Sequence, residues 1–284
     1  MIITKILGGL GNQLFQYAAG YALAAKNETV LKLDLSGFDD YRLRSFELSR
    51  FNAVCFPAAD AEIIKMKPTG SVGRVRNRLS AMRHKRFYKQ PYFHYDPDFF
   101  SLRSPVYLQG YFQSEKYFAP VAAEIRQAFT FREGLAEEII SVAAKLQKIN
   151  SVSLHIRRGD YGNVEALRVH GILPISYYER AIAKIKEIHT DAQFFIFSDE
   201  PNRISEEPAI QGAEIISGRI TQNHLEDFFL MSQCRHNIIA NSSFSWWAAW
   251  LNNHCEKTVI APQQWFAHGP KDTQDLLPRD WMRL

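Results

Sequence analysis

The alternation of apolar and polar positions divides the first part of the chain into short strands and one long helix. Residues 2–7 form an apolar run, residues 8–11 are rich in glycine, and residues 12–26 repeat apolar positions with helical spacing. A second apolar run follows at residues 29–35. This order of strand, glycine turn, helix and strand predicts a right-handed βαβ unit in a parallel sheet.

The remaining chain separates into a stretch without clear periodicity and a regular second half. Residues 36–114 are rich in aromatic, proline and basic residues and predict no definite element. Helical spacing returns at residues 115–129 and 133–148. Beyond residue 150, strands are predicted at 151–156, 193–197, 214–216, 237–240 and 258–261, and helices at 176–188, 225–234 and 245–252. Strands that alternate with helices indicate a doubly wound α/β unit.

Length and composition agree with two lobes built on parallel sheets. The chain has 284 residues, of which 46% are hydrophobic and 23% charged, as in ordinary globular proteins. We therefore predict an N-terminal lobe over residues 1–150 and a C-terminal lobe over residues 151–284, whose tail is allowed to cross back. One large domain is the alternative, because the length alone does not separate the two.

Targeting and redox features are few. There is no apolar run of about 18 residues and no start typical of a signal peptide, so we expect a cytoplasmic protein. The three cysteines, Cys55, Cys234 and Cys255, are scattered, which argues against a disulfide framework and against a zinc site.

One basic segment stands out against a formal net charge of only +4. Residues 65–89 contain no acidic residue, and their basic residues are Lys65, Lys67, Arg74, Arg76, Arg78, Arg83, Lys85, Arg86 and Lys89. A solvated surface is one interpretation. A patch for anionic lipid headgroups or for a pyrophosphate-linked acceptor is the other. Nucleic acid is disfavoured, because no nucleic-acid-binding module accompanies the segment.

Four polar motifs follow predicted strands, where open parallel sheets bind their ligands. They lie at residues 8–13, 155–161, 198–200 and 241–247. Arg157 and Arg158 leave a strand side by side, and guanidinium groups suit the oxygens of a diphosphate. The alternative is a structural pair between one arginine and Asp160.

The other three motifs are individually weaker. Residues 241–245 combine asparagine and serine with a helix start, which favours an anion site or plain helix capping. Asp199 is placed to accept hydrogen bonds from guanine or to cap a helix. The glycine turn lacks the third glycine of a dinucleotide fingerprint, because Leu14 occupies that position. Trp246 and Trp247 are expected to pack in the core.

Taken together, the motifs resemble glycosyltransferase family 11, the family of the bacterial α-1,2-fucosyltransferases. The family's Gly-Leu-Gly-Asn-Gln-Leu-Phe-Gln-Tyr-Ala segment is matched by residues 9–18, and its His-x-Arg-Arg-Gly-Asp-Tyr motif by residues 155–161. Its Phe-Ser-Asp motif corresponds to residues 197–199, and its Ser-Phe-Ser-Trp-Trp-Ala-Ala-Trp-Leu motif to residues 243–251. The matches span most of the chain in the family's order.

The resemblance implies a GT-B-like architecture, with Rossmann-like lobes and a donor cleft between them. It also implies that GDP-fucose is held mainly by the C-terminal lobe without a cofactor or divalent metal, and the sequence has no DxD motif. The implied catalytic residues are Arg157, Asn12 and Asp160, of which Asp160 is a candidate base that equally suits the orientation of Arg158. The implied donor-binding residues are His155, Arg157, Arg158, Asp199, Ser242, Ser243, Phe244 and Gln13.

The function implied is that of a galactoside 2-α-L-fucosyltransferase, which transfers fucose from GDP-β-L-fucose to O2 of a terminal galactose with inversion. A fucosyltransferase of another linkage, such as α-1,6, and a non-catalytic nucleotide-sugar-binding protein are the alternatives. The expected acceptor is a galactose-terminated oligosaccharide or lipid-linked glycan of a surface polysaccharide. Peripheral contact with the inner membrane face through residues 65–89 fits such an acceptor. Aromatic candidates for sugar stacking are Tyr92, Phe93, Tyr95 and Tyr111, though core packing is the more common role.

Overall fold

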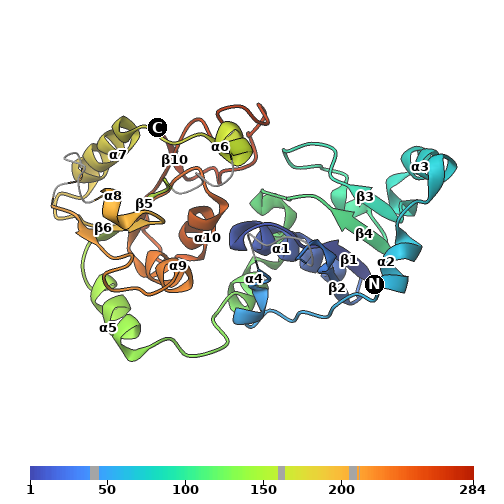
Figure 1. Cartoon of the computed structure of the whole chain (residues 1–284), viewed down its shortest axis with the longest axis horizontal. Helices are drawn as coiled ribbons and strands as arrows, with labels where there is room; N and C mark the ends of the chain where they lie inside the picture. The colour runs from blue at the N-terminus through green and yellow to red at the C-terminus, as the bar shows by residue number, and fades with distance from the viewer. Residues whose placement is uncertain (39–44, 159–163, 205–209, 211) are drawn as a thin grey trace. The chain divides into compact units, whose positions relative to one another are not determined.

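Two parallel sheets, each with its own helices, make up the protein (Figure 1). The computed structural model describes residues 1–38, 45–158, 164–204, 210 and 212–284. The chain divides into a first unit of Met1–Glu133 with Asp272–Pro278, and a second unit of Gly134–Lys271 with Arg279–Leu284. The sequence predicted a boundary at residue 150, but the division falls after Glu133. The reason is that the helix starting at Glu137 packs against a helix of the second unit.

The first unit contains a four-stranded sheet with the order β2-β1-β4-β3, and every neighbouring pair is parallel. Its strands are β1 (Ile2–Lys5), β2 (Leu31–Asp34), β3 (Phe87–Lys89) and β4 (Val106–Gln109). Its α-helices are α1 (Leu10–Lys26), α2 (Asp60–Met66), α3 (Gly70–Leu79) and α4 (Ala122–Ala128). The predicted βαβ opening is confirmed as β1, α1 and β2.

Two differences from the sequence prediction have clear local causes. Strands β3 and β4 lie in the stretch that showed no periodicity, because they have only three and four residues. The helix expected over residues 115–129 begins as two 3₁₀ turns and becomes α-helical only at Ala122. Pro120 lies in the second turn and has no amide hydrogen to donate, so it stands at a helix start rather than inside one.

The second unit contains a six-stranded parallel sheet with the order β10-β9-β8-β5-β6-β7. Its strands are β5 (Ser151–Ile156), β6 (Gln193–Ser198), β7 (Glu214–Ile215), β8 (His236–Ile238), β9 (Val259–Ala261) and β10 (Met282–Arg283). Its helices are α5 (Glu137–Leu146), α6 (Val164–His170), α7 (Ile175–Ile188), α8 (Pro201–Ile204), α9 (His224–Gln233) and α10 (Ser243–Leu251).

Helices cover both faces of the second sheet, as the doubly wound prediction required. Helix α7 buries Tyr177, Ala181 and Ile185 against the apolar residues of β5, β6 and β8. Helices α5, α9 and α10 pack with one another, and Figure 1 shows α7 and α9 on opposite sides of the strands. The fold class of two Rossmann-like parallel units is therefore confirmed.

The tryptophans of α10 belong to the core, as expected. Trp246 and Trp247 are fully buried, and the ring of Trp246 lies 5.4 Å from that of Trp281. Within the part of the chain that the structure describes, no helix has the length and apolar character needed to cross a bilayer.

Candidate functional site

The strand order of the second sheet places a crevice between β5 and β8. The first strand of this unit, β5, pairs with β6 on one side and with β8 on the other. Open α/β sheets bind ligands beyond the carboxyl ends of the strands where the order reverses in this way. The motif at residues 155–158 ends β5, and the motif at residues 241–245 follows β8. The topology thus brings together two motifs separated by more than eighty residues.

A hydrogen bond joins these motifs across the crevice. The Nη1 of Arg157 donates to Oγ of Ser242 over 3.1 Å. Ser242 is the N-cap of α10, and its Oγ also accepts from the backbone amide of Phe244. The guanidinium is therefore held at the amino-terminal end of a helix, where the backbone dipoles favour an anion. A half-buried arginine and a capped helix start together suit the oxygens of a phosphate.

The main chain of Arg158 is bound to the side chain of Asp199. The backbone amide of Arg158 donates to Oδ1 of Asp199 over 2.8 Å, and Nη1 of Arg158 donates to the carbonyl of Leu173 over 3.1 Å. Asp199 follows β6 directly and is exposed. The adjacent ends of β5 and β6 are thereby fastened to each other, with the Asp199 carboxylate at the same edge of the sheet as His155.

His155 carries a buried polar atom without a protein partner. Only 7% of the residue is exposed, and among the described residues its Nδ1 makes no hydrogen bond. Burial, opposed by the negative charge of Asp199 and aided by the positive charge of Arg157, lowers the pKa of His155 to about 4. The ring is therefore neutral at pH 7 and offers one donor and one acceptor. An unsatisfied buried nitrogen at a strand end is typical of a ligand contact.

Aromatic side chains surround the outer side of this histidine. The ring of Phe244 lies 5.7 Å from that of His155, and Phe228 and His224 of α9 lie 5.2 and 6.3 Å from Phe244. Phe244 itself is half-buried, as is Ser243 beside it. A planar base fits a site that combines flat apolar walls with a few polar atoms. The sequence predicted Phe244 here but missed Phe228 and His224, because no motif marked either residue.

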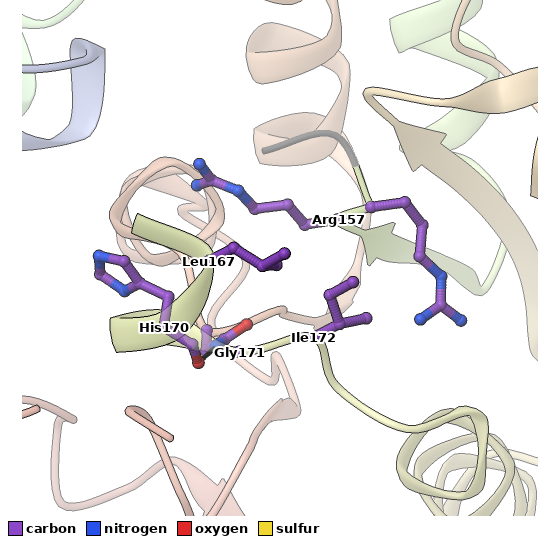
Figure 2. A pocket seen from close by; sticks show the side chains of 7 residues that line it. Arg157, Leu167, His170, Gly171 and Ile172 are labelled. Atoms are coloured by element: carbon purple, nitrogen blue, oxygen red, sulfur yellow. Dashed lines mark hydrogen bonds between the residues drawn. The ribbon is translucent and has the colours of Figure 1, made fainter. Parts of the chain in front are cut away.

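A small pocket lies beside the two arginines (Figure 2). Its lining residues are Arg157, Arg158, Leu167, His170, Gly171, Ile172 and Asn241. The Nδ2 of Asn241 donates to the carbonyls of His170 and Trp265 over 2.8 and 3.2 Å, which fixes the end of α6 beside the end of β8. Gly171 has φ +70°, and a Cβ there would lie 2.8 Å from Cβ of Ala267. Sequence reasoning missed this turn, and its glycine was the available sign.

A buried carboxylate also supports the site without having been predicted. Asp227 accepts hydrogen bonds from Ser217 and Thr221 over 2.8 and 2.5 Å, and Ser217 in turn accepts from the amide of Ser198. Burial raises the pKa of Asp227 in spite of the hydrogen bonds. This chain of contacts ties the first turn of α9 to the end of β6.

The first unit places Asn12 and Gln13 at the start of α1, just beyond β1. Gln13 is fully buried; its Nε2 donates to the carbonyls of Gly8 and Ser45, and its Oε1 accepts from the amide of Glu47. Its amide is thus occupied by the protein, and its predicted contact with the donor stays a prediction. Asn12 is half-buried, and its Oδ1 accepts from Nε2 of Gln113 over 2.7 Å.

The remaining predicted residues are distributed unevenly. Asp160 lies outside the described residues. Tyr92 and Tyr111 are exposed, with Tyr92 stacked on His94 at 4.8 Å, whereas the ring of Tyr95 packs edge-on against that of Tyr117. In the described ranges, no group of three or more His, Cys, Asp or Glu residues is arranged to hold a metal ion.

Comparison with known proteins identifies the family. The model of the family described as "Glycosyl transferase family 11" matches residues 1–284. The α-1,2-colitosyltransferase of Escherichia coli is 35% identical over 100% of this chain and 99% of its own length. The O-antigen biosynthesis glycosyltransferase WbnK of Escherichia coli is 33% identical over 98% of both chains. A galactoside α-(1,2)-fucosyltransferase of Oryctolagus cuniculus is 26% identical over 86% of this chain and 62% of its own.

Proposed function

The chain belongs to glycosyl transferase family 11, and from this we propose that it transfers L-fucose from GDP-fucose to O2 of a terminal galactose, with inversion and without a metal ion. The acceptor we propose is a glycan of a surface polysaccharide. The observation that carries the proposal is the Arg157–Ser242 hydrogen bond across the β5–β8 crevice, because it fixes a cation where a leaving diphosphate needs one.

Side chains of the second unit suit two parts of GDP, the β-phosphate and the guanine, which supports this proposal. Arg157 and the start of α10 suit the β-phosphate, because negative charge accumulates there as the glycosidic bond breaks. The neutral ring of His155, with its unsatisfied nitrogen and the face of Phe244 nearby, suits guanine. Asp199 suits the two donors on the guanine edge, which adenine lacks.

The reaction proposed is a single displacement at the anomeric carbon. The acceptor O2 forms a bond to that carbon on the face opposite the diphosphate, the bond to the phosphate oxygen breaks, and the electron pair leaves with GDP. Arg157 stabilises the growing negative charge, which in many transferases is the task of a divalent ion. The proton of the acceptor hydroxyl is released late in such a loose transition state, so a weak base suffices.

A second donor is supported by one relative. The colitosyltransferase matches the whole chain at 35% identity, and colitose is L-fucose without its 3-hydroxyl. Both donors would present the same GDP moiety to Arg157 and His155, so the contacts described above do not separate them. The α-1,2 linkage is common to this relative and to the mammalian fucosyltransferase.

The test is a donor and acceptor panel with purified protein. GDP-fucose and GDP-colitose are each incubated with lactose and with both types of N-acetyllactosamine, in the presence and absence of EDTA. We expect transfer to galactose O2, located by NMR of the product, at a rate that the chelator does not change. Transfer to another hydroxyl refutes the linkage, and loss of rate with EDTA refutes metal independence.

Two further outcomes address the alternatives. If kcat/KM for GDP-colitose exceeds that for GDP-fucose by tenfold or more, a difference of roughly 1.4 kcal/mol, then the donor is the 3-deoxy sugar and not fucose. Tight binding of GDP without transfer to any galactoside refutes the proposed acceptor. A protein that fails to bind GDP at all contradicts the whole assignment of the β5–β8 crevice.

A further inference from the structure

Helix α3 of the first unit packs very little of its surface against the protein. All of its residues, from Gly70 to Leu79, retain some solvent exposure, and none is buried. A helix of this length gains most of its stability from packing an apolar face, so a helix with no buried residue is incomplete by itself. Figure 1 shows α3 beside β3, the strand at the end of the four-stranded sheet.

The contacts that α3 does make come from one side. Asn77 donates from Nδ2 to the carbonyl of Phe87 over 2.8 Å, and its Oδ1 accepts from the amide of the same residue. Lys85 donates from Nζ to the carbonyls of Asn77 and Arg78 at the carboxyl end of the helix. These bonds hold the Asn77 side of α3 to β3 and leave the opposite side to solvent.

That opposite side is apolar. Val72, Val75 and Leu79 are spaced three and four residues apart, which puts them on one face of the helix. They are 83%, 56% and 80% exposed, among the highest values for apolar residues in the described chain. An apolar stripe of this kind, exposed and rimmed by polar residues, marks an interaction surface.

Cationic side chains border the stripe. Arg74, Arg76 and Arg78 alternate with the apolar residues along α3 and are exposed, as are Arg83, Arg86 and Lys89 after it. The nine basic residues between Lys65 and Lys89 exceed the net charge of +4 of the whole chain, so the rest of the protein is net negative. The concentration of positive charge in this segment therefore favours an anionic partner at this surface.

A cationic cavity of about 330 Å³ lies on the Asn77 side of α3, between the helix and β3. Its basic lining residues are Arg74, Arg78, Lys85 and Lys89. Asp96 is the single acid among the lining residues, and it is buried and accepts a hydrogen bond from Tyr88 over 2.7 Å. The cavity therefore presents a surplus of positive charge with room for a phosphate group.

We propose that α3 and the segment to Lys89 dock on an anionic lipid bilayer, with Val72, Val75 and Leu79 at the boundary of headgroups and acyl chains. A basic amphipathic helix with an exposed apolar face binds lipid by apolar burial together with attraction to anionic headgroups. Charge complementarity selects this partner over an uncharged surface. The apolar stripe selects it over nucleic acid, which would engage the arginines and leave three large apolar side chains in water.

The experiment measures sedimentation of the full-length protein with vesicles of phosphatidylcholine, with and without one third phosphatidylglycerol. We expect binding to the anionic vesicles that weakens as salt rises, and little binding to phosphatidylcholine alone. Replacing Arg74, Arg76 and Arg78 by glutamine removes three charges, each contributing a factor of about five near an anionic surface, so partitioning should fall about a hundredfold. The variant Val72→Ser/Val75→Ser/Leu79→Ser should fall by at least tenfold with its charge unchanged.

Matched controls separate this surface from general charge and hydrophobicity. Glutamine at the exposed Lys145, Lys148 and Lys271 removes the same charge, and serine at the exposed Ile140 and Ile188 removes apolar surface from two other helices. Both controls should bind vesicles as the unaltered protein does. Wild-type protein that stays in the supernatant, equal binding to both vesicle types, or equal losses in controls and α3 variants would each overturn the proposal. Tight binding to duplex DNA without vesicle binding would assign the arginines to nucleic acid instead.

Discussion

The two units place polar side chains at equivalent points of their sheets, but one of these side chains is charged in the second unit and all are neutral in the first. In each unit the first strand lies between neighbours that lead away in different directions, β2 and β4 around β1, and β6 and β8 around β5. A side-chain hydrogen bond crosses this point in both units. In the second unit it joins Arg157 to Ser242, and in the first it joins Asn12 to Gln113.

The difference lies in charge and in unsatisfied atoms. The second unit offers a guanidinium and a neutral histidine with an unpartnered Nδ1, which suits an anionic nucleotide. The first unit offers two uncharged amides, and the neighbouring Gln13 is occupied by three hydrogen bonds of its own. Neutral amides suit hydroxyl groups, which both donate and accept. The comparison teaches that one topology carries a charged hydrogen-bonded pair in one unit and a neutral pair in the other, as the proposed charged donor and uncharged acceptor require.

The largest effect is expected at the Arg157–Ser242 hydrogen bond of the second unit. Arg157→Ala should lower kcat about 100- to 1,000-fold, because it removes the cation that faces the leaving diphosphate. Arg157→Lys should recover part of the loss, since a point charge replaces a fork of donors. Steady-state transfer assays measure both, and circular dichroism checks the fold. Arg180→Ala, at an exposed position of α7, is the matched control and should keep full activity.

If the kcat of Arg157→Ala stayed within threefold of normal, Arg157 would not stabilise the leaving diphosphate. If its GDP affinity also stayed normal, the β5–β8 crevice would not be the diphosphate site.

Lowering the pH is expected to destabilise the second unit before the first. Burial lowers the pKa of both His155 and His236 to about 4, and neighbouring positive charges act in the same direction. The unfolded chain binds protons at a pKa of about 6.5, so stability contributed by these neutral rings is lost as pH falls from about 6.5 towards 4. The loss at pH 4.5 should be on the order of 2 kcal/mol for each of the two histidines.

The first unit has a different acid response. Its histidines, His84 and His94, are not buried. Burial acts to raise the pKa of Asp34, but hydrogen bonds from Ser36 and Tyr107 together with the charge of Lys67 hold it below its usual value, so its contribution disappears only below about pH 4. Hydrogen exchange between pH 7 and 4.5, corrected for the intrinsic rate, should show earlier loss of protection in the second unit. Earlier loss in the first unit would contradict this ordering.

The sequence predicted the second unit better than the first for physical reasons. Strand β5 was predicted at its observed bounds, because Val152, Leu154 and Ile156 recur at every second position, the period of a strand. In the first unit, Phe99, Phe112 and Tyr117 are fully buried, yet they belong to a 3₁₀ turn, a loop and another 3₁₀ turn. A core built from such irregular segments has no period to detect, so β3 and β4 were missed.

The same limit applied to the site. The pairing of residues 155–158 with residues 241–245 followed from the rule that strand ends share an edge. His170 and Ile172 reach the pocket only because Asn241 holds the turn after α6, and no spacing in the sequence encodes that contact.

A smaller effect is expected at the Asn12–Gln113 hydrogen bond of the first unit. Gln113→Ala removes the hydrogen bond that Oδ1 of Asn12 accepts from Gln113. If the first unit binds the acceptor, KM for the galactoside should rise about fivefold while the affinity for GDP stays unchanged, as the loss of one neutral hydrogen bond of about 1 kcal/mol predicts. Gln113→Glu keeps the shape and an acceptor but cannot donate when ionised, so it should resemble the alanine variant. A change in GDP affinity without a change in acceptor KM would mean that the Asn12–Gln113 pair contacts the donor instead.

The smallest effect is expected at Ser242, which supports Arg157 without carrying charge. Ser242→Ala removes the cap of α10, which typically costs about 1 kcal/mol of stability, and releases one Nη1 hydrogen bond of Arg157. The guanidinium keeps its charge, so kcat should fall only about three- to fivefold. Ser242→Thr retains the hydroxyl and should restore both quantities. Because a lost cap alone lowers the melting temperature but not kcat at 25 °C, an alanine variant with normal kcat would limit Ser242 to capping and leave Arg157 positioned by its other neighbours.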